Sequence, residues 1–155
     1  MPSHLAARDV AFVACSSASP KKLDAYKKKL GWTFRWLSAS DNFQKDCKVS
    51  FSEEEAADPQ CKNYNHGTAH WSSTEAPGVS VFTKRDDKVY LTYSTFARGL
   101  DVFMTAYHFL DCVPKGRDES TFDDKPMTWI QRRTDYSDYV QDNWWSFLLP
   151  YGESF

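Results

Sequence analysis

Residues 78–114 carry the clearest hydrophobic pattern in the chain. Over residues 79–83, Val79, Val81 and Thr83 alternate with Ser80 and Phe82, and residues 89–93 show the same period of two, with the charged run RDDK between the segments. This period of two predicts two strands joined by a hairpin turn. After Gly99 the apolar residues follow helical spacing instead, and we expect one continuous helix packed back on the hairpin. Its inward positions are Leu100, Phe103, Met104, Tyr107 and Leu110, and Pro114 ends the pattern.

A strand, a helix and a second strand are predicted in the N-terminal part. Residues 10–15 (VAFVAC) form a continuous apolar run, which is typical of a strand covered on both faces inside a parallel sheet. Ser19 and Pro20 provide an N-cap and a first helical residue, and Gly31 ends the helix that follows. The alternating residues 33–37 (TFRWL) predict the second strand. Together the three elements predict a right-handed βαβ unit.

Two segments follow neither period. Residues 53–76 are polar and interrupted by proline and glycine. A loop of this length is typical of a functional lid or of disorder, and the sequence leaves both open. Residues 136–155 concentrate aromatic and aliphatic side chains, so this tail is expected to pack on its own domain or on a partner.

A chain of 155 residues predicts one domain spanning residues 1–155, of the α/β class.

Composition and charge narrow the classes of function. The formal net charge is -2 and both signs are interspersed, so no nucleic-acid partner is predicted. There is no leader-like apolar segment and no run of membrane-spanning length, which predicts a cytoplasmic protein without a membrane partner. Aromatic residues make up 16% of the chain, with six Trp and eight Tyr. Such side chains are typical of pocket walls and interfaces.

The cysteines and histidines do not form a recognisable metal or redox motif. The four cysteines are Cys15, Cys47, Cys61 and Cys112. They lack CxxC spacing, and we expect buried free thiols, including Cys15 at the end of the apolar strand. The segment CKNYNHGTAH contains Cys61, His66 and His70, but a zinc site needs four ligands or three and a water. No metal and no cofactor are therefore predicted.

Polar residues at the ends of the predicted elements are candidates for acid–base chemistry. Asp101 and His108 share one face of the predicted helix with Thr105 and Cys112, and a histidine there can shuttle a proton or activate a thiol. The solvent face of an amphipathic helix has the same pattern. The predicted catalytic residues are Tyr93, Arg98, Asp101 and His108, and the predicted substrate-binding residues are Trp36, Arg117, Trp129 and Arg132.

The arginines have two interpretations. An arginine at the end of an element can hold a carboxylate or phosphate in a bidentate manner. Arg98 can equally form an ion pair with Asp101, and for Arg117 we favour a structural pair with Asp118.

Several motifs in one order carry a resemblance to a known family. They are HLAARDVAFVA, AYKKKLGWTFRW, GVSVF, YSTFARGLD, PKGRDE and MTWIQRR. Over most of residues 4–136 they resemble the bacterial and fungal domain-of-unknown-function 899 (DUF899) family, whereas residues 53–75 and the tail after 139 do not. The resemblance implies a thioredoxin-like fold and a dithiol–disulfide oxidoreductase label. Members carry a further strand and a CxxC helix before the first motif, so it implies a thioredoxin-like sandwich truncated at its N-terminus.

These observations favour a non-redox enzyme. Thiol exchange needs a thiolate of low pKa and a resolving thiol, and neither is recognisable. We expect acid–base chemistry of the lyase, isomerase or cyclase type on a small, partly aromatic organic molecule in an aromatic pocket. The alternatives are a thiol–disulfide oxidoreductase that uses Cys15 or Cys112, and a non-catalytic binding or assembly module. A homodimer is expected because the truncation uncovers an apolar edge.

Overall fold

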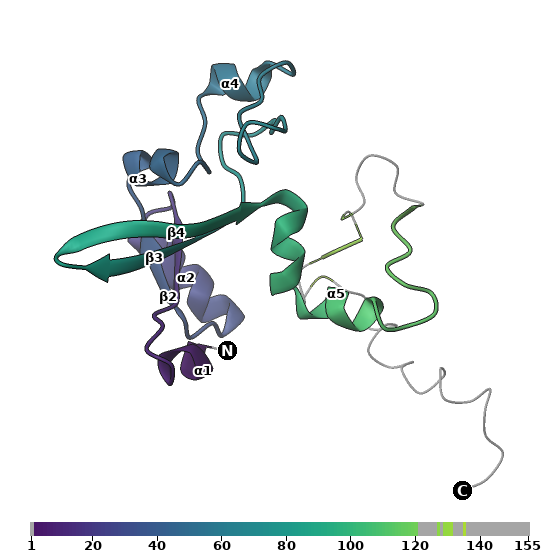
Figure 1. Ribbon diagram of the computed structural model, residues 1–155, viewed down its shortest axis with the longest axis horizontal. Coiled ribbons are helices and arrows are strands. Elements are labelled where there is room, and N and C mark those ends of the chain that lie inside the picture. Colours follow the sequence, from purple (N-terminus) through teal and green to yellow (C-terminus); the bar gives the residue numbers. More distant parts are fainter. Residues whose placement is uncertain (1, 121–126, 128, 132–134, 136–155) are drawn as a thin grey trace, which may run out of the picture. The chain divides into compact units, whose positions relative to one another are not determined.

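The computed structural model describes residues 2–120, 127, 129–131 and 135 (Figure 1). It is a mixed α/β structure with two small sheets, as the sequence predicts at the level of class. The chain forms two compact units, Met1–Met104 and Thr105–Phe155. Two compact units can belong to one domain, so the single domain stays a prediction. Among the described residues, no helix has the length and apolar character that crossing a membrane requires.

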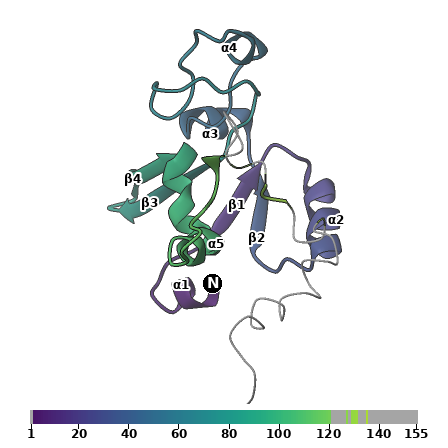
Figure 2. The same ribbon diagram turned by 90° about the vertical axis from the view of Figure 1, so that its right-hand side faces the viewer.

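The strand–helix–strand unit is present near the N-terminus, after a short helix α1 (Pro2–Ala6). The strand β1 (Val13–Ser16) pairs in parallel with β2 (Arg35–Ser38), and α2 (Pro20–Leu30) connects them. Figure 2 shows α2 alongside β2. Gly31 ends α2 in the left-handed region, with φ of 66°, which glycine adopts without a steric penalty.

The expected burial of β1 on both faces is wrong. Phe12, Val13 and Cys15 are all solvent-exposed. The reason is topological, because β1 hydrogen-bonds only to β2 among the described strands and a two-stranded sheet has no interior strand. The apolar run therefore belongs to an edge strand in this structure.

The hairpin is confirmed. The strands β3 (Gly78–Arg85) and β4 (Lys88–Phe96) pair antiparallel and form one long ribbon (Figure 1). Asp86 and Asp87 make the two-residue turn with positive φ values of 49° and 59°, the conformation that matches the twist of a hairpin. A register shift after Val81 marks an irregularity in the ladder.

The single helix predicted after Gly99 is wrong. The segment splits into a 3-10 helix η1 (Ala97–Phe103) and a short α-helix α5 (Thr105–Leu110). Met104 lies between them with φ of -102° and ψ of 98°, an extended conformation that interrupts the helical hydrogen bonds. The break also separates the two compact units. Apolar spacing alone does not reveal it, because side chains three residues apart align in both kinds of helix.

The segment predicted as a lid or disorder, residues 53–76, is ordered and contributes Tyr64 to the hydrophobic core. It follows α3 (Asp41–Asp46) and contains α4 (Glu53–Ala57), whose start is fixed by a reciprocal capping box. The core cluster comprises Phe51, Tyr64 and Phe96. Disorder is therefore wrong for these residues.

The Tyr64 hydroxyl connects the loop to both ends of the hairpin. Its side chain is 2% exposed. The hydroxyl donates to the Pro77 carbonyl oxygen at 2.6 Å and accepts from the Ala97 backbone N–H at 2.9 Å. Pro77 directly precedes β3, and Ala97 directly follows β4. One side chain therefore fixes where β3 begins and where β4 ends.

We expect Tyr64→Phe to lower the free energy of unfolding by about 1–3 kcal/mol, because two backbone groups lose their buried partner. Urea denaturation followed by circular dichroism measures this change. The control is Tyr90→Phe on β4, where the tyrosine is exposed and no comparable loss is expected. Equal stability of the Tyr64 variant and the wild type would contradict the assignment.

Candidate functional site

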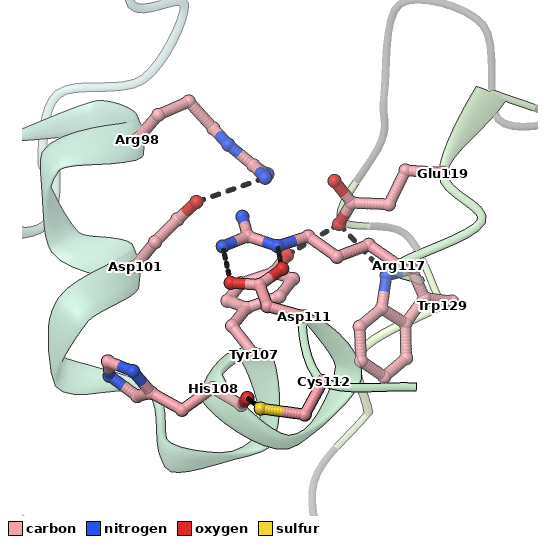
Figure 3. Close-up of polar contacts among 9 residues, drawn as sticks. All are labelled: Arg98, Asp101, Tyr107, His108, Asp111, Cys112, Arg117, Glu119 and Trp129. Carbon is pink, nitrogen blue, oxygen red and sulfur yellow. Dashed lines mark hydrogen bonds and ion pairs between the residues drawn. The ribbon is translucent and has the colours of Figure 1, made fainter. Parts of the chain in front are cut away.

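Arg98 and Asp101 form an ion pair within η1. Arg98 Nη2 lies 3.0 Å from Asp101 Oδ2, and the Asp101 side chain is only 12% exposed (Figure 3). A separation of three residues suits the three-residue turn of a 3-10 helix. The ion-pair alternative for Arg98 is thus realised in the structure.

The polar face predicted for one continuous helix does not exist. Asp101 lies in η1 and His108 in α5, so the spacing of seven residues no longer aligns them. The Cys112 thiol donates to the His108 backbone carbonyl oxygen at 3.2 Å, which does not involve the imidazole ring. This contact gives no support to activation of the thiol by His108.

The other predicted residues lie apart in the chain. Tyr93 is exposed on β4, opposite Val81 of β3. Trp36 lies half-buried on β2 among other aromatic rings. Arg132 falls outside the described residues.

The densest polar arrangement centres on Glu119, and we call it the Glu119 cluster. Its members are Tyr107, Asp111, Arg117, Glu119 and Trp129. Glu119 Oε1 accepts a hydrogen bond from the Tyr107 hydroxyl at 2.6 Å and another from Trp129 Nε1 at 3.1 Å (Figure 3). Tyr107 is 1% exposed, and its ring meets that of Trp129 edge-on at 5.9 Å. A phenol and an indole thus converge on one carboxylate oxygen.

Arg117 forms the other half of the cluster. Its Nε and Nη2 atoms bind Asp111 Oδ1 and Oδ2 at 2.6 and 2.7 Å, and its guanidinium lies 4.2 Å from the centroid of the Tyr107 ring. These are a bidentate ion pair and a cation–π contact. The hydrogen bonds from Arg117 lower the pKa of the Asp111 carboxyl. The predicted pair of Arg117 with Asp118 is wrong, because Asp118 binds Lys115 at 2.8 Å instead.

Local geometry explains how these residues meet. Tyr107 and Asp111 are four residues apart, so they lie on the same side of α5 and of the turn that continues it. Gly116 and Asp118 then adopt positive φ values of 64° and 49° and reverse the chain. The reversal returns Glu119 to the Tyr107 hydroxyl.

The sequence predicted two members of the cluster and missed three. Arg117 and Trp129 were expected to bind substrate, whereas Tyr107 was assigned to an apolar helix face and Asp111 and Glu119 received no role. The four-residue spacing of Tyr107 and Asp111 was a usable signal. No signal marks Glu119, because its contacts depend on the turn between residues 112 and 118.

The thiols show no sign of activation at Cys15. Partial desolvation of the sulfur atom, and secondly repulsion by the ionised form of the neighbouring Cys47, raise the pKa of Cys15, and partial desolvation also raises the pKa of Cys47. A catalytic thiol requires the opposite shift. All four cysteines are free, as expected, but Cys15 and Cys112 are exposed and Cys47 and Cys61 are half-buried, so the expectation of buried thiols is wrong.

The loop histidines have structural contacts. His70 Nδ1 lies 3.1 Å from the Cys61 carbonyl oxygen, and the His66 ring packs edge-on against Phe96 at 4.9 Å. Within the described ranges, no group of three His, Cys, Asp or Glu side chains is placed to hold a metal ion.

A comparison with known families matches residues 1–136 to the family described as "Bacterial protein of unknown function (DUF899)". The chain belongs to the DUF899 family. The DUF899 match confirms the resemblance of the sequence motifs, and it also spans residues 53–75, which those motifs did not cover. Neither the curated proteins nor the solved structures contain a match to the chain.

We expect Arg117→Gln to raise the pKa of Asp111 toward its ordinary value, because the lowered pKa depends on hydrogen bonds from Arg117. A carboxyl-carbon NMR titration measures this pKa. Since the folded-state pKa is lowered, the ion pair stabilises the fold above the ordinary pKa of aspartate. That contribution is lost as the pH falls through the folded-state pKa.

Lys115→Gln is the matched control, since it removes a neighbouring cation that pairs with Asp118. It should leave the Asp111 titration unchanged. An unchanged Asp111 pKa in Arg117→Gln would show that the bidentate pair does not form in solution.

Proposed function

We propose that this DUF899 chain is a non-redox enzyme that acts by acid–base chemistry on a small, partly aromatic organic molecule. The proposal is carried by one observation: Glu119 Oε1 receives hydrogen bonds from both Tyr107 and Trp129. Such a carboxylate is fixed in orientation, which is what a group that accepts a proton from a substrate requires. Lyase, isomerase and cyclase reactions all need this proton transfer.

The proposed roles follow from the contacts. Glu119 accepts a proton from the substrate and returns it to the product, while the Tyr107 hydroxyl, 2.6 Å away, holds the carboxylate in orientation through its hydrogen bond. The Arg117 guanidinium over the Tyr107 ring holds that ring in place. The Trp129 ring offers an aromatic surface for the substrate. Tyr93, Arg98, Asp101 and His108 stay predictions as catalytic residues.

The finer fold assignment belongs to the same proposal. We propose that the α/β structure is a thioredoxin-like sandwich. The order of the DUF899 motifs, the parallel pair β1–β2 and the antiparallel pair β3–β4 support this assignment. A cytoplasmic enzyme without nucleic-acid or membrane partners and without a cofactor is proposed from the composition and motifs.

The test is proton exchange catalysed by the purified chain. A panel of aromatic keto acids, with phenylpyruvate as its first member, is incubated in deuterated water, and loss of the acidic C–H signal is followed by proton NMR. We expect Glu119→Gln to reduce the exchange rate by about 100-fold or more, because the amide keeps the hydrogen-bond acceptor but not the basic oxygen.

Asp118→Asn is the matched control, because it neutralises the adjacent carboxylate that binds Lys115. Its exchange rate should equal that of the wild type. The proposal is contradicted if no member of the panel exchanges above the protein-free rate, or if Glu119→Gln exchanges normally.

A second function, that of an assembly module, is favoured by the exposed apolar surface of the hairpin. Val89 is 68% exposed and Leu91 53%, and Phe82 and Tyr93 are also exposed. A two-stranded ribbon is marginally stable alone, and exposed apolar patches of this kind mark association surfaces. We propose that the chain associates into a homodimer through this ribbon.

We expect light scattering at micromolar concentration to give the mass of a dimer, and Leu91→Lys to shift it toward one chain by placing a charge in the contact. Lys88→Glu, a charge change at the turn of the hairpin, serves as the control. A wild-type mass of one chain would contradict the dimer.

A further inference from the structure

An aromatic row occupies one face of the strand–helix–strand unit. Trp36 lies on β2, Trp32 and Phe34 lie in the segment that leads into β2, and ring contacts bring the three side chains together. The Trp32 ring lies 5.5 Å from Trp36 and 5.2 Å from Phe34, and Tyr26 of α2 meets both tryptophans edge-on. We call Tyr26, Trp32, Phe34 and Trp36 the Trp36 cluster.

Two buried polar atoms on this face have no hydrogen-bond partner among the described residues. They are Trp36 Nε1 and Ser16 Oγ. The strand register pairs Ala14 with Trp36 and Ser16 with Ser38, so Ser16 and Trp36 share the face that α2 covers. A buried donor without a partner is costly, and such groups usually mark a missing ligand or water.

In two other described tryptophans, the indole N–H has a hydrogen-bond acceptor within the protein. Trp71 Nε1 donates to the Glu75 carbonyl oxygen at 2.7 Å, and Trp129 Nε1 donates to Glu119 at 3.1 Å. An indole can only donate, so the missing partner of Trp36 must be an acceptor.

The positive charge at the end of α2 indicates which kind of hydrogen-bond acceptor would bind to Trp36. Lys27, Lys28 and Lys29 form the last turn of α2, directly before Gly31 and Trp32. Of the charged residues of α2, only Asp24 is acidic. The field near the Trp36 cluster therefore favours an anion over a neutral carbonyl compound.

We infer that the Trp36 cluster binds a planar aromatic carboxylate. The carboxylate accepts a hydrogen bond from Trp36 Nε1, with the Ser16 hydroxyl as a second polar group on the same face. The aromatic ring of the ligand stacks against the indole rings. Trp32 is the most exposed ring of the cluster, at 41%, so the ligand reaches the cluster from its side.

This inference concerns the Met1–Met104 unit alone and does not depend on the function that we propose for Glu119. Its test requires no turnover, so failure of binding is distinguishable from failure of the acid–base chemistry at Glu119.

The probe is 4-hydroxybenzoate, compared with the neutral 4-hydroxybenzyl alcohol. Nitrogen–proton NMR spectra of the full chain resolve the indole N–H signals, and the Trp36 signal is the one lost in Trp36→Phe. We expect the acid to shift this signal downfield and the alcohol to bind at least about tenfold more weakly. By calorimetry, Trp36→Phe should lose about tenfold in affinity for the acid, and Ser16→Ala a smaller factor.

Trp71→Phe is the matched control, because it removes an indole N–H that already has a partner. It should lower the melting temperature and leave the affinity unchanged. Trp36→Phe should keep or raise the melting temperature of the free protein, because it removes an unpaired buried donor. The site is overturned if the acid leaves the Trp36 signal in place, if Trp36→Phe binds it normally, or if the alcohol binds equally well.

Discussion

The hydrogen bonds of the Tyr64 hydroxyl hold together the larger unit of this chain. They join the middle of a long irregular segment to the residue before β3 and to the residue after β4. The ring of Tyr64 packs against Phe51, Trp71 and Phe96, so the same side chain also fills the hydrophobic core. The strands contribute one residue to that core cluster, Phe96 at the end of β4, whereas most of the hairpin is exposed. The loop therefore stabilises the strands, which reverses the usual relation between loops and sheets.

In the second unit the Glu119 carboxylate is the group on which several hydrogen bonds converge, as the Tyr64 hydroxyl is in the first unit. Glu119 collects two donors, and Arg117 bridges the Tyr107 ring to Asp111. The described part of this unit contains one short helix, so polar contacts between side chains carry an unusual share of its order. A network of this kind stabilises a fold only when every member has a partner. The same requirement fixes the carboxylate for the acid–base role that we propose.

The tryptophans differ in whether the indole N–H has a hydrogen-bond acceptor, and this difference separates structural from proposed functional positions. Trp71 and Trp129 each donate to an oxygen of their own unit, and each fixes a turn or a cluster. Trp36 is packed among rings but leaves its donor unpaired. Hydrophobicity alone would treat the three residues alike. The difference lies in the acceptor, and the missing acceptor is the basis of the ligand site that we infer at Trp36.

The sequence by itself determined the elements whose signals are local. The helix α2 with Pro20 and Gly31, the hairpin with its turn at Asp86, and membership of the DUF899 family were all readable from it. Periodicity, caps and turn residues act within a few positions of one another, so they survive without tertiary context.

Only the tertiary structure decided the core, the break at Met104 and the Glu119 cluster. The structural role of Tyr64 depends on its hydrogen bonds to Pro77 and Ala97, which lie 13 and 33 residues away in the sequence. Glu119 meets Tyr107 because two positive-φ residues reverse the chain between them. Such contacts depend on where the backbone returns in space, and a pattern of polar and apolar residues does not encode that return.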